Sequence, residues 1–537
     1  MHSSAQAALR ATHAARGKLS LHPLFRDFGL TAFTEFGVLV SGLAIISLMG
    51  RLLGVVALGE YLLLRRVLAW LQPAVQLGMG NALPRYVAYN ADGPPSKLRR
   101  YLVISLALSG GLASLLAILL YFGRGTFGGW FFGSAHLQVL ILPLGFMAVG
   151  LTIHGSAYGY FRGRLALIQA NALQTCDMVF VPLIVVIALA KTHSVALIVG
   201  TTGLLTILFS ALVCAVLLRH GTSGQPESRN TASELLRYGV PRVPGDFALG
   251  GLLAIGPLVA MHFVPISSVT CLLLGISILS AVNASSTPVG ALMLSKVSMM
   301  LVQDRREEVR TCLHHFLVAV IQLAVFVCLE LVILTDVLLR VWVGRDFGAE
   351  VVVAQIIMMG IPFYLTYGCL RGSVDAASIT AYNTHNLFFS LGLFGILLAA
   401  VVGLLPRALT PAGVAASLLL ALVLLAGLTL RTTHKLFGLG VPWRQIAPGV
   451  ALGASLACAT ALAQHTLGTR GGMFAPMALA GAATIIFLSA LKVMGSPWVS
   501  FFINLSFRRS TREGPRCVVP VPPELVLSSP SDFNEGM

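Results

Sequence analysis

The chain has 537 residues, of which 56% are hydrophobic and only 10% are charged, and its formal net charge is +16. A soluble domain averages about 25% charged residues, so this composition excludes an ordinary soluble protein. The positive charge is better explained by basic loops at a membrane surface than by binding to nucleic acid, which we do not expect.

Residues 1–28 are polar and basic and lack the short apolar core of a cleaved signal peptide, so we expect a cytoplasmic tail. Fourteen apolar segments follow, each long enough to cross ~30 Å of hydrocarbon as a helix. Backbone groups find no water in lipid, so helix is the expected state. The predicted fold class is therefore an all-α polytopic membrane protein with about 14 transmembrane helices. The predicted spans are 29–50, 57–83, 101–122, 137–160, 166–190, 194–218, 239–262, 268–294, 313–339, 350–370, 385–405, 412–430, 447–464 and 474–494.

The distribution of basic residues predicts the orientation. Most of the 36 lysines and arginines fall in segments on the same side as the N-terminus. Basic residues concentrate on the cytoplasmic side of membrane proteins, so both termini are predicted to be cytoplasmic. The opposite loops hold only Arg51, Arg124, Lys191, Arg340, Arg345, Arg407 and Arg470.

The longest polar interruption, 219–238, predicts a cytoplasmic linker between two six-helix lobes at 29–218 and 239–430. Two further helices are predicted within 447–494, followed by a Pro/Ser-rich, disordered tail at 507–537. The segments 58–83 and 269–294 echo each other, because Leu62–Leu64 match Leu272–Leu274 and Gly80 matches Gly290 at one constant separation. An even number of spans separates these copies, which predicts two lobes related in parallel.

Several chemistries have no signature in the sequence. The eight cysteines and 13 histidines show no metal-ligand spacing, and no phosphate-binding GxxxxGK[ST] loop or DxD pair occurs. We therefore expect no cofactor, no metal site and no catalytic residues.

The main anomaly is the adjacent pair Arg65 and Arg66, which lies inside the second apolar segment. A charge at bilayer depth costs about 3 kcal/mol on insertion scales, so the pair needs a role. At 100° per residue, Tyr61, Arg65, Gln72 and Gln76 form one polar stripe. Either the arginines line a cavity and bind an anion through their planar guanidinium groups, together with Gln72 and Gln76, or they reach the outer interface.

Two acidic residues inside the spans are candidates for coupling to an ion. Glu35 lies on the first span and Asp177 on the fifth, and either is interpreted as a proton or sodium site, as a partner for the arginines, or as a local helix–helix contact. His154 is interpreted as a packing residue. Asp246 lies four residues after Arg242, a spacing that favours an intrahelical ion pair.

Three segments resemble a known family. These are GRLLG, LGEY and LGMGNALPRYVA around the first helix pair (50–54, 58–61 and 77–88), YGVPRVPGDFALGGLLAIGPL at 238–258, and CLRGSVDAASITAYNTHNL at 369–387. In this order and spacing, they resemble polysaccharide flippases of the multidrug/oligosaccharidyl-lipid/polysaccharide exporter superfamily. The sequence departs from that family at Arg65 and Arg66, where the family has small or apolar residues.

The resemblance implies a transporter, not an enzyme. Its substrate would be a polyprenyl-pyrophosphate-linked oligosaccharide, flipped across a bacterial inner membrane by alternating access for surface polysaccharide or lipopolysaccharide export. The implied partners are the lipid bilayer, this lipid-linked substrate and polysaccharide polymerase or assembly proteins. Three alternatives remain: a cation-coupled multidrug exporter, a peptidoglycan-precursor flippase, and a membrane polysaccharide polymerase or ligase. The last would need a reactive outer loop, and every outer loop here is short.

Overall fold

The computed structural model describes residues 21–91, 93–219, 230–378, 380–467 and 474–495. These residues are almost entirely helical and contain no strand. Within them, thirteen helices are long and apolar enough to cross a membrane. The fourteenth span expected from the sequence is α3 (Val55–Gln76), which is also long enough but carries Glu60 beside the two arginines. The predicted tail at 507–537 lies outside the described residues, as do residues 1–20 of the predicted N-terminal tail.

The first half of the chain folds into helices that are repeatedly interrupted by short π- or 3-10-helical turns. In order, they are α2 (Leu21–Leu48), η1 (Met49–Leu53), α3, α4 (Met79–Tyr89), α5 (Pro95–Ser105), η2 (Leu106–Gly110), α6 (Gly111–Phe122), α7 (Arg124–Phe132), η3 (Ala135–Leu140), α8 (Ile141–Gly163), α9 (Leu167–Thr175), η4 (Cys176–Phe180), α10 (Val181–Leu189), η5 (Ala190–Thr192) and α11 (Val195–Arg219).

The second half has longer and less interrupted helices. They are α12 (Thr231–Gly239), η6 (Val240–Arg242), α13 (Val243–Ala260), α14 (Ile266–Ala284), α15 (Thr287–Val302), α16 (Arg306–Val343), η7 (Gly348–Glu350), α17 (Val351–Met358), α18 (Ile361–Ala377), α19 (Tyr382–Leu404), η8 (Arg407–Leu409), α20 (Thr410–Phe437), α21 (Trp443–Leu467) and α22 (Phe474–Val493).

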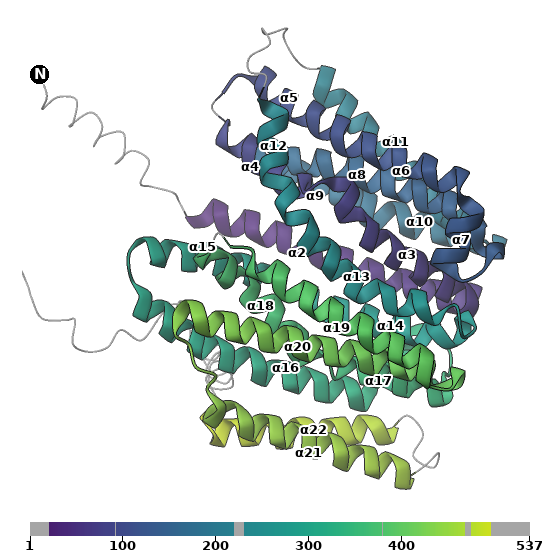
Figure 1. Cartoon of the computed structure of the whole chain (residues 1–537), viewed down its shortest axis with the longest axis vertical. Helices are drawn as coiled ribbons and strands as arrows, with labels where there is room; N and C mark the ends of the chain where they lie inside the picture. Colours follow the sequence, from purple (N-terminus) through teal and green to yellow (C-terminus); the bar gives the residue numbers. More distant parts are fainter. Residues whose placement is uncertain (1–20, 92, 220–229, 379, 468–473, 496–537) are drawn as a thin grey trace, which may run out of the picture.

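The helices form two groups that meet along α3, α13 and α14 (Figure 1). In the first group α8 packs against α4, α6 and α11, and in the second α20 packs against α17, α18 and α19. The helices α21 and α22 form a separate hairpin beside α16 (Figure 1). One large buried apolar cluster runs from Ile45 on α2 to Leu425 on α20, so apolar packing continues across the junction between the groups.

The second span of each half is broken at a corresponding place. In the first half, Leu77 and Gly78 adopt left-handed backbone angles (φ 50° and 70°) and separate α3 from α4. In the second half, the chain breaks between α14 and α15 at Ser285 and Ser286. The leucine triplets that echo each other in sequence lie on α3 and α14, are fully buried, and belong to the same apolar cluster. Both halves therefore break their second span after the leucine triplet, and the parallel relation of the two lobes stays a prediction.

The polar segment 219–238 is not only a linker. Residues 220–229 lie outside the described part of the chain, but Thr231–Gly239 forms the helix α12, which packs on α4 and α5. The contact with α4 is very close, because a Cβ atom on Gly78 would lie 2.3 Å from the Gly239 carbonyl oxygen. Only glycines allow the two backbones to approach this closely.

The two groups are also joined at the end predicted to face outward. The Ser47 hydroxyl donates to the Trp342 carbonyl oxygen (2.5 Å), and the Trp342 indole donates to the Leu43 carbonyl oxygen (2.8 Å). The Arg51 guanidinium donates to the carbonyl oxygen of Val341, at the same end of α16. These contacts hold the end of α2 against the end of α16.

Candidate functional site

A cavity of about 260 Å³ lies inside the first half of the chain, among α2, α3, α8, η4, α10 and α11. Most of its wall is apolar, with residues such as Leu64, Leu68 and Met147. Its polar lining consists of Tyr61, Arg65, Gln72, Asp177, Thr202 and Thr206. An apolar pocket with a few convergent polar groups is the usual form of a ligand site.

The polar stripe predicted on α3 forms one side of this cavity. Tyr61, Arg65 and Gln72 all line it, as their helical spacing predicts. The Arg65 side chain is exposed and lies 5.7 Å from the centre of the Tyr61 ring, within cation–π range. Gln72 donates its amide to the Thr152 hydroxyl (3.0 Å), while its own oxygen is buried without a hydrogen-bond partner.

Gln76, the fourth member of the stripe, does not line this cavity. It lies past Pro73, and its amide nitrogen packs against α8, where a Cβ atom on Gly155 would lie 3.1 Å from it. Gln76 therefore lies where α3 crosses α8, outside the part of the stripe that lines the cavity.

Arg66 lies in a different environment from its neighbour. Its guanidinium donates to the hydroxyls of Ser277 (3.0 Å) and Ser280 (3.2 Å), both on α14. The side chain is half-buried between the two halves of the chain and is absent from the cavity lining. The adjacent arginines thus separate into a cavity residue and a residue that joins α3 to α14.

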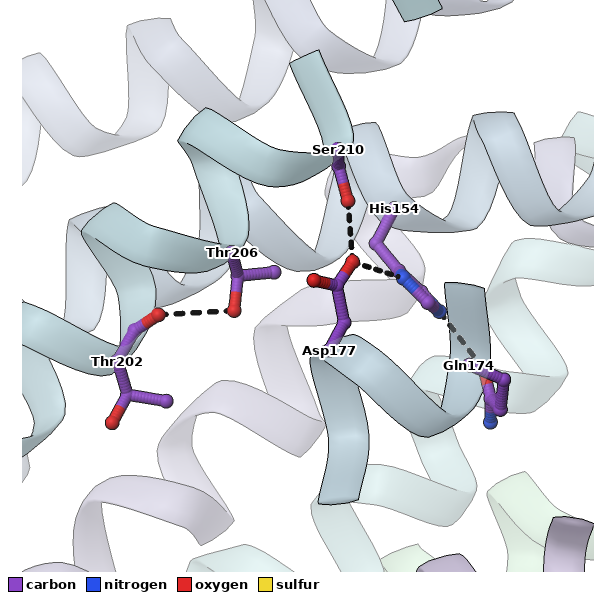
Figure 2. Close-up of polar contacts among 6 residues, drawn as sticks. All are labelled: His154, Gln174, Asp177, Thr202, Thr206 and Ser210. Atoms are coloured by element: carbon purple, nitrogen blue, oxygen red, sulfur yellow. Dashed lines mark hydrogen bonds and ion pairs between the residues drawn. The ribbon is translucent and has the colours of Figure 1, made fainter. Parts of the chain in front are cut away.

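Asp177 lies at the centre of a buried polar cluster (Figure 2). It sits on the π-helical turn η4 and is only 2% exposed. Its Oδ2 atom accepts a hydrogen bond from the Ser210 hydroxyl (2.5 Å) and lies 2.8 Å from Nδ1 of His154. Its Oδ1 atom is buried with no hydrogen-bond partner, and the residue lines the cavity.

The other ring nitrogen of His154 completes the cluster. Nε2 lies 2.8 Å from Oε1 of Gln174, one helical turn before Asp177 (Figure 2). The ring is buried and packs face to face with Tyr158, with 5.9 Å between ring centres. A buried carboxylate is costly unless paired, and this one is paired with an imidazole and a hydroxyl.

Glu35 does not reach the cavity. Its side chain is exposed, and its carboxylate accepts a hydrogen bond from the Tyr158 hydroxyl (3.3 Å). Of the two acids proposed from the sequence, only Asp177 is buried against the cavity.

Sequence reasoning missed the role of His154, which contacts Asp177 instead of only packing. A signal was available, because His154 and Asp177 lie about equally far from the turn that joins α8 to α9. Residues placed in this way on a helical hairpin lie at the same depth.

The expected pairing of Asp246 with Arg242 is wrong. Asp246 accepts from Arg371 of α18 at 2.9 Å, whereas Arg242 donates to the Tyr238 carbonyl oxygen and lies over the Tyr238 ring. Arg371 also approaches Asp375 (3.9 Å). This ion pair joins α13 to α18, so tertiary packing decided the partner where sequence spacing suggested a local one.

In the part of the chain that the structure describes, no three His, Cys, Asp or Glu side chains come together as a metal site. The cavity therefore offers hydrogen bonds, one exposed guanidinium and one buried carboxylate–imidazole pair. This set of groups can bind an anion and exchange a proton.

No family model and no curated protein matches the sequence. Solved structures do match. "Lipid II flippase MurJ, inward closed conformation" has a TM-score of 0.64 at 15% identity and covers 87% of this chain and 98% of its own. The chain has the fold of the MurJ and MATE transporters.

Two MATE structures also match the fold of this chain. An inward-facing multidrug resistance MATE family transporter of the MOP superfamily has a TM-score of 0.55 at 15% identity, covering 80% of this chain and 94% of its own. A eukaryotic MATE transporter has a TM-score of 0.51 at 12% identity, covering 80% and 99%. At these identities the likeness establishes the fold alone and leaves both the role and the substrate open.

Proposed function

We propose that this protein flips a polyprenyl-pyrophosphate-linked oligosaccharide across a bacterial inner membrane by alternating access. The fold supports transport, and the single observation that favours an anionic substrate is the exposed Arg65 guanidinium in an otherwise mostly apolar cavity. Among the described residues Arg65 makes no ion pair, so its charge is available to a ligand. A guanidinium binds phosphate through two parallel hydrogen bonds.

In this proposal the residues have separate roles. Arg65 contacts the phosphates, Gln72 lines the cavity beside it, and Arg66 joins α3 to α14 in the arrangement described here. Asp177 couples the cycle to an ion. The membrane potential adds a bias, since moving a negative charge outward gains about 2.3 kcal/mol per 100 mV when the interior is negative.

A peptidoglycan-precursor flippase is the second candidate, because the MurJ structure covers more of this chain than the MATE structures do. It would use the same cationic cavity. A cation-coupled multidrug exporter fits less well, because its cavity should be dominated by acids, whereas this one pairs its only acid with His154.

The test replaces Arg65 and Arg66 separately with Ala. In cells of the source organism, Arg65→Ala should lower surface polysaccharide and raise lipid-linked intermediates at a normal protein level, and Arg65→Lys should retain part of the activity. Arg124→Ala removes the arginine that begins α7, which does not line the cavity, and serves as the matched control. Normal export in Arg65→Ala would refute the anion site.

Native mass spectrometry of the purified protein then tests the substrate class. A bound polyprenyl-pyrophosphate glycan supports the proposal, and its sugar composition separates a polysaccharide unit from a peptidoglycan precursor. A bound drug-like cation would favour the exporter instead.

A further inference from the structure

We propose that the ion bound at Asp177 is a proton and that His154 and Asp177 hold it together as one imidazolium–carboxylate pair. The role of this pair in transport rests on the proposed function, but its protonation does not.

Both ring nitrogens of His154 face oxygen atoms. Nδ1 faces the Asp177 carboxylate and Nε2 faces the amide oxygen of Gln174, each at 2.8 Å. When Asp177 is ionised neither oxygen can donate, so a ring that keeps both hydrogen bonds donates from both nitrogens. The arrangement in Figure 2, with one oxygen facing each ring nitrogen, is one that a doubly protonated ring beside a carboxylate satisfies.

The same cluster can accommodate loss of one proton. The proton on Nε2 leaves to solvent water, and rotation of the Gln174 amide brings its NH2 group to Nε2, which then accepts. Nδ1–H continues to donate to Asp177, as does the Ser210 hydroxyl. No buried polar atom loses its partner in this step, so the cluster can hold two charge states with one backbone arrangement.

A sodium ion suits this site poorly. Asp177 offers only one unpartnered oxygen, Oδ1, because its Oδ2 atom already accepts from two donors, and an imidazolium in contact with the carboxylate repels a second cation. The ring cannot move aside easily, because it packs against Tyr158 and is 6% exposed.

The charge of the pair affects Arg65, because Arg65 and Asp177 line the same cavity. With the proton bound the pair is neutral, and Arg65 is free to bind an anion. Without it the pair carries a negative charge, which competes with the anion for Arg65 across a low-dielectric space. Proton binding and anion binding therefore reinforce each other, and the coupling is reciprocal.

Few other titratable groups surround the pair. Among the described residues they are Glu35 on α2, Tyr61 and Arg65 on α3, Tyr158 and Arg162 on α8, Cys176 on η4 and Cys214 on α11. Glu35 and Arg162 contact Tyr158, which packs on the His154 ring.

The first test uses the full chain in lipid without any ligand. Nitrogen-15 NMR of labelled histidines, with His154→Gln used to assign the His154 signal by difference, reports how many ring nitrogens are protonated. We expect an imidazolium signal that is replaced by a neutral-ring signal as the pH is raised. Asp177→Asn should abolish the imidazolium signal. A His154 ring that stays neutral throughout in the wild type would overturn the proposal.

The second test measures proton uptake during anion binding, with inorganic pyrophosphate as the probe. Calorimetry in two buffers of different ionisation enthalpy gives the number of protons taken up, and His154→Gln subtracts those that pyrophosphate itself takes up. On acidification, the affinity for pyrophosphate should rise more steeply in the wild type than in His154→Gln. The difference should be at most about tenfold per pH unit, which is the limit for one linked proton. His262→Gln, whose ring contacts only backbone carbonyls, should behave as the wild type.

The outcomes separate the two proposals. An NMR titration without pyrophosphate binding would support the proton pair and count against the anion cavity. Pyrophosphate binding with equal pH dependence in wild type and His154→Gln would overturn the coupling. Saturable binding of radioactive sodium that Asp177→Asn abolishes would overturn the assignment of the ion.

Discussion

At the scale of single residues, two adjacent arginines have unlike surroundings because successive helical residues point about 100° apart. Arg65 points into a cavity, while Arg66 points at α14 and has only hydroxyl partners. A half-buried arginine that pairs with no carboxylate relies on its neutral hydrogen-bond partners to stabilise its charge. This dependence can be measured.

Replacing both Ser277 and Ser280 with Ala should destabilise the protein by about 1–3 kcal/mol, because the guanidinium loses its partners while its charge remains. Adding Arg66→Met should restore most of that stability, since apolar residues often replace a buried charge without loss. Thermal unfolding of the purified variants in detergent measures both effects. A triple variant that is less stable than the double variant would contradict this account.

The sequence predicted the polar stripe on α3 and an acidic side chain, Asp177, inside the fifth span, because both follow from residue type and helical period. It did not predict that His154 pairs with Asp177, that Arg371 pairs with Asp246, or that α14 supplies hydroxyls to Arg66. Each of these depends on which helices pack together. The substrate-binding and ion-coupling roles of the six candidate residues stay predictions; these residues are Arg65, Arg66, Gln72, Gln76, Glu35 and Asp177.

At the scale of helices, the crossing of α4 and α12 determines where the second half begins. Its backbones touch at Gly78 and Gly239, and the aromatic rings of Tyr86, Tyr101 and Tyr238 pack beside them. The Tyr101 hydroxyl donates to Glu234 of α12 (2.5 Å). The polar composition of 219–238 indicated a linker and concealed this helix, whose apolar contacts come from few residues.

Gly239→Ala should disrupt the crossing, because its Cβ atom would lie 2.4 Å from the Leu77 carbonyl oxygen. Overpacking of this kind costs about 1–3 kcal/mol. Gly392→Ala on α19 has open space around the new methyl group and serves as the control. The melting temperature should fall only for Gly239→Ala, and an equal change in both variants would argue against a tight crossing.

At the scale of the whole molecule, the described contacts close the end predicted to face outward. Arg51, Ser47 and Trp342 join α2 to α16, and Gly59 packs against Thr270 where α3 meets α14. Alternating access would require these contacts to separate during each cycle. The all-helical fold was predictable from composition, whereas this closed end depends on contacts between distant residues.

A disulfide between Gly59→Cys and Thr270→Cys tests that requirement, because a Cβ atom on Gly59 would lie 2.4 Å from the Thr270 hydroxyl. Oxidation should stop export and reduction should restore it, with each single variant as a control. Mass spectrometry of peptides verifies the cross-link. Full export by a fully cross-linked protein would exclude opening at this end.

The π-helical turn at Cys176–Phe180 has a consequence for how this chain compares with its structural neighbours. A π-turn holds one more residue than an α-turn, so it is equivalent to a single-residue insertion inside a helix. Deleting one residue there would restore a continuous α-helix, because the wider turn already absorbs the rotation of the extra residue. The residues on either side of the turn would keep their present faces. A turn of this kind lets chains that differ by one residue keep the same helix packing, which is one way for a fold to persist at 15% identity.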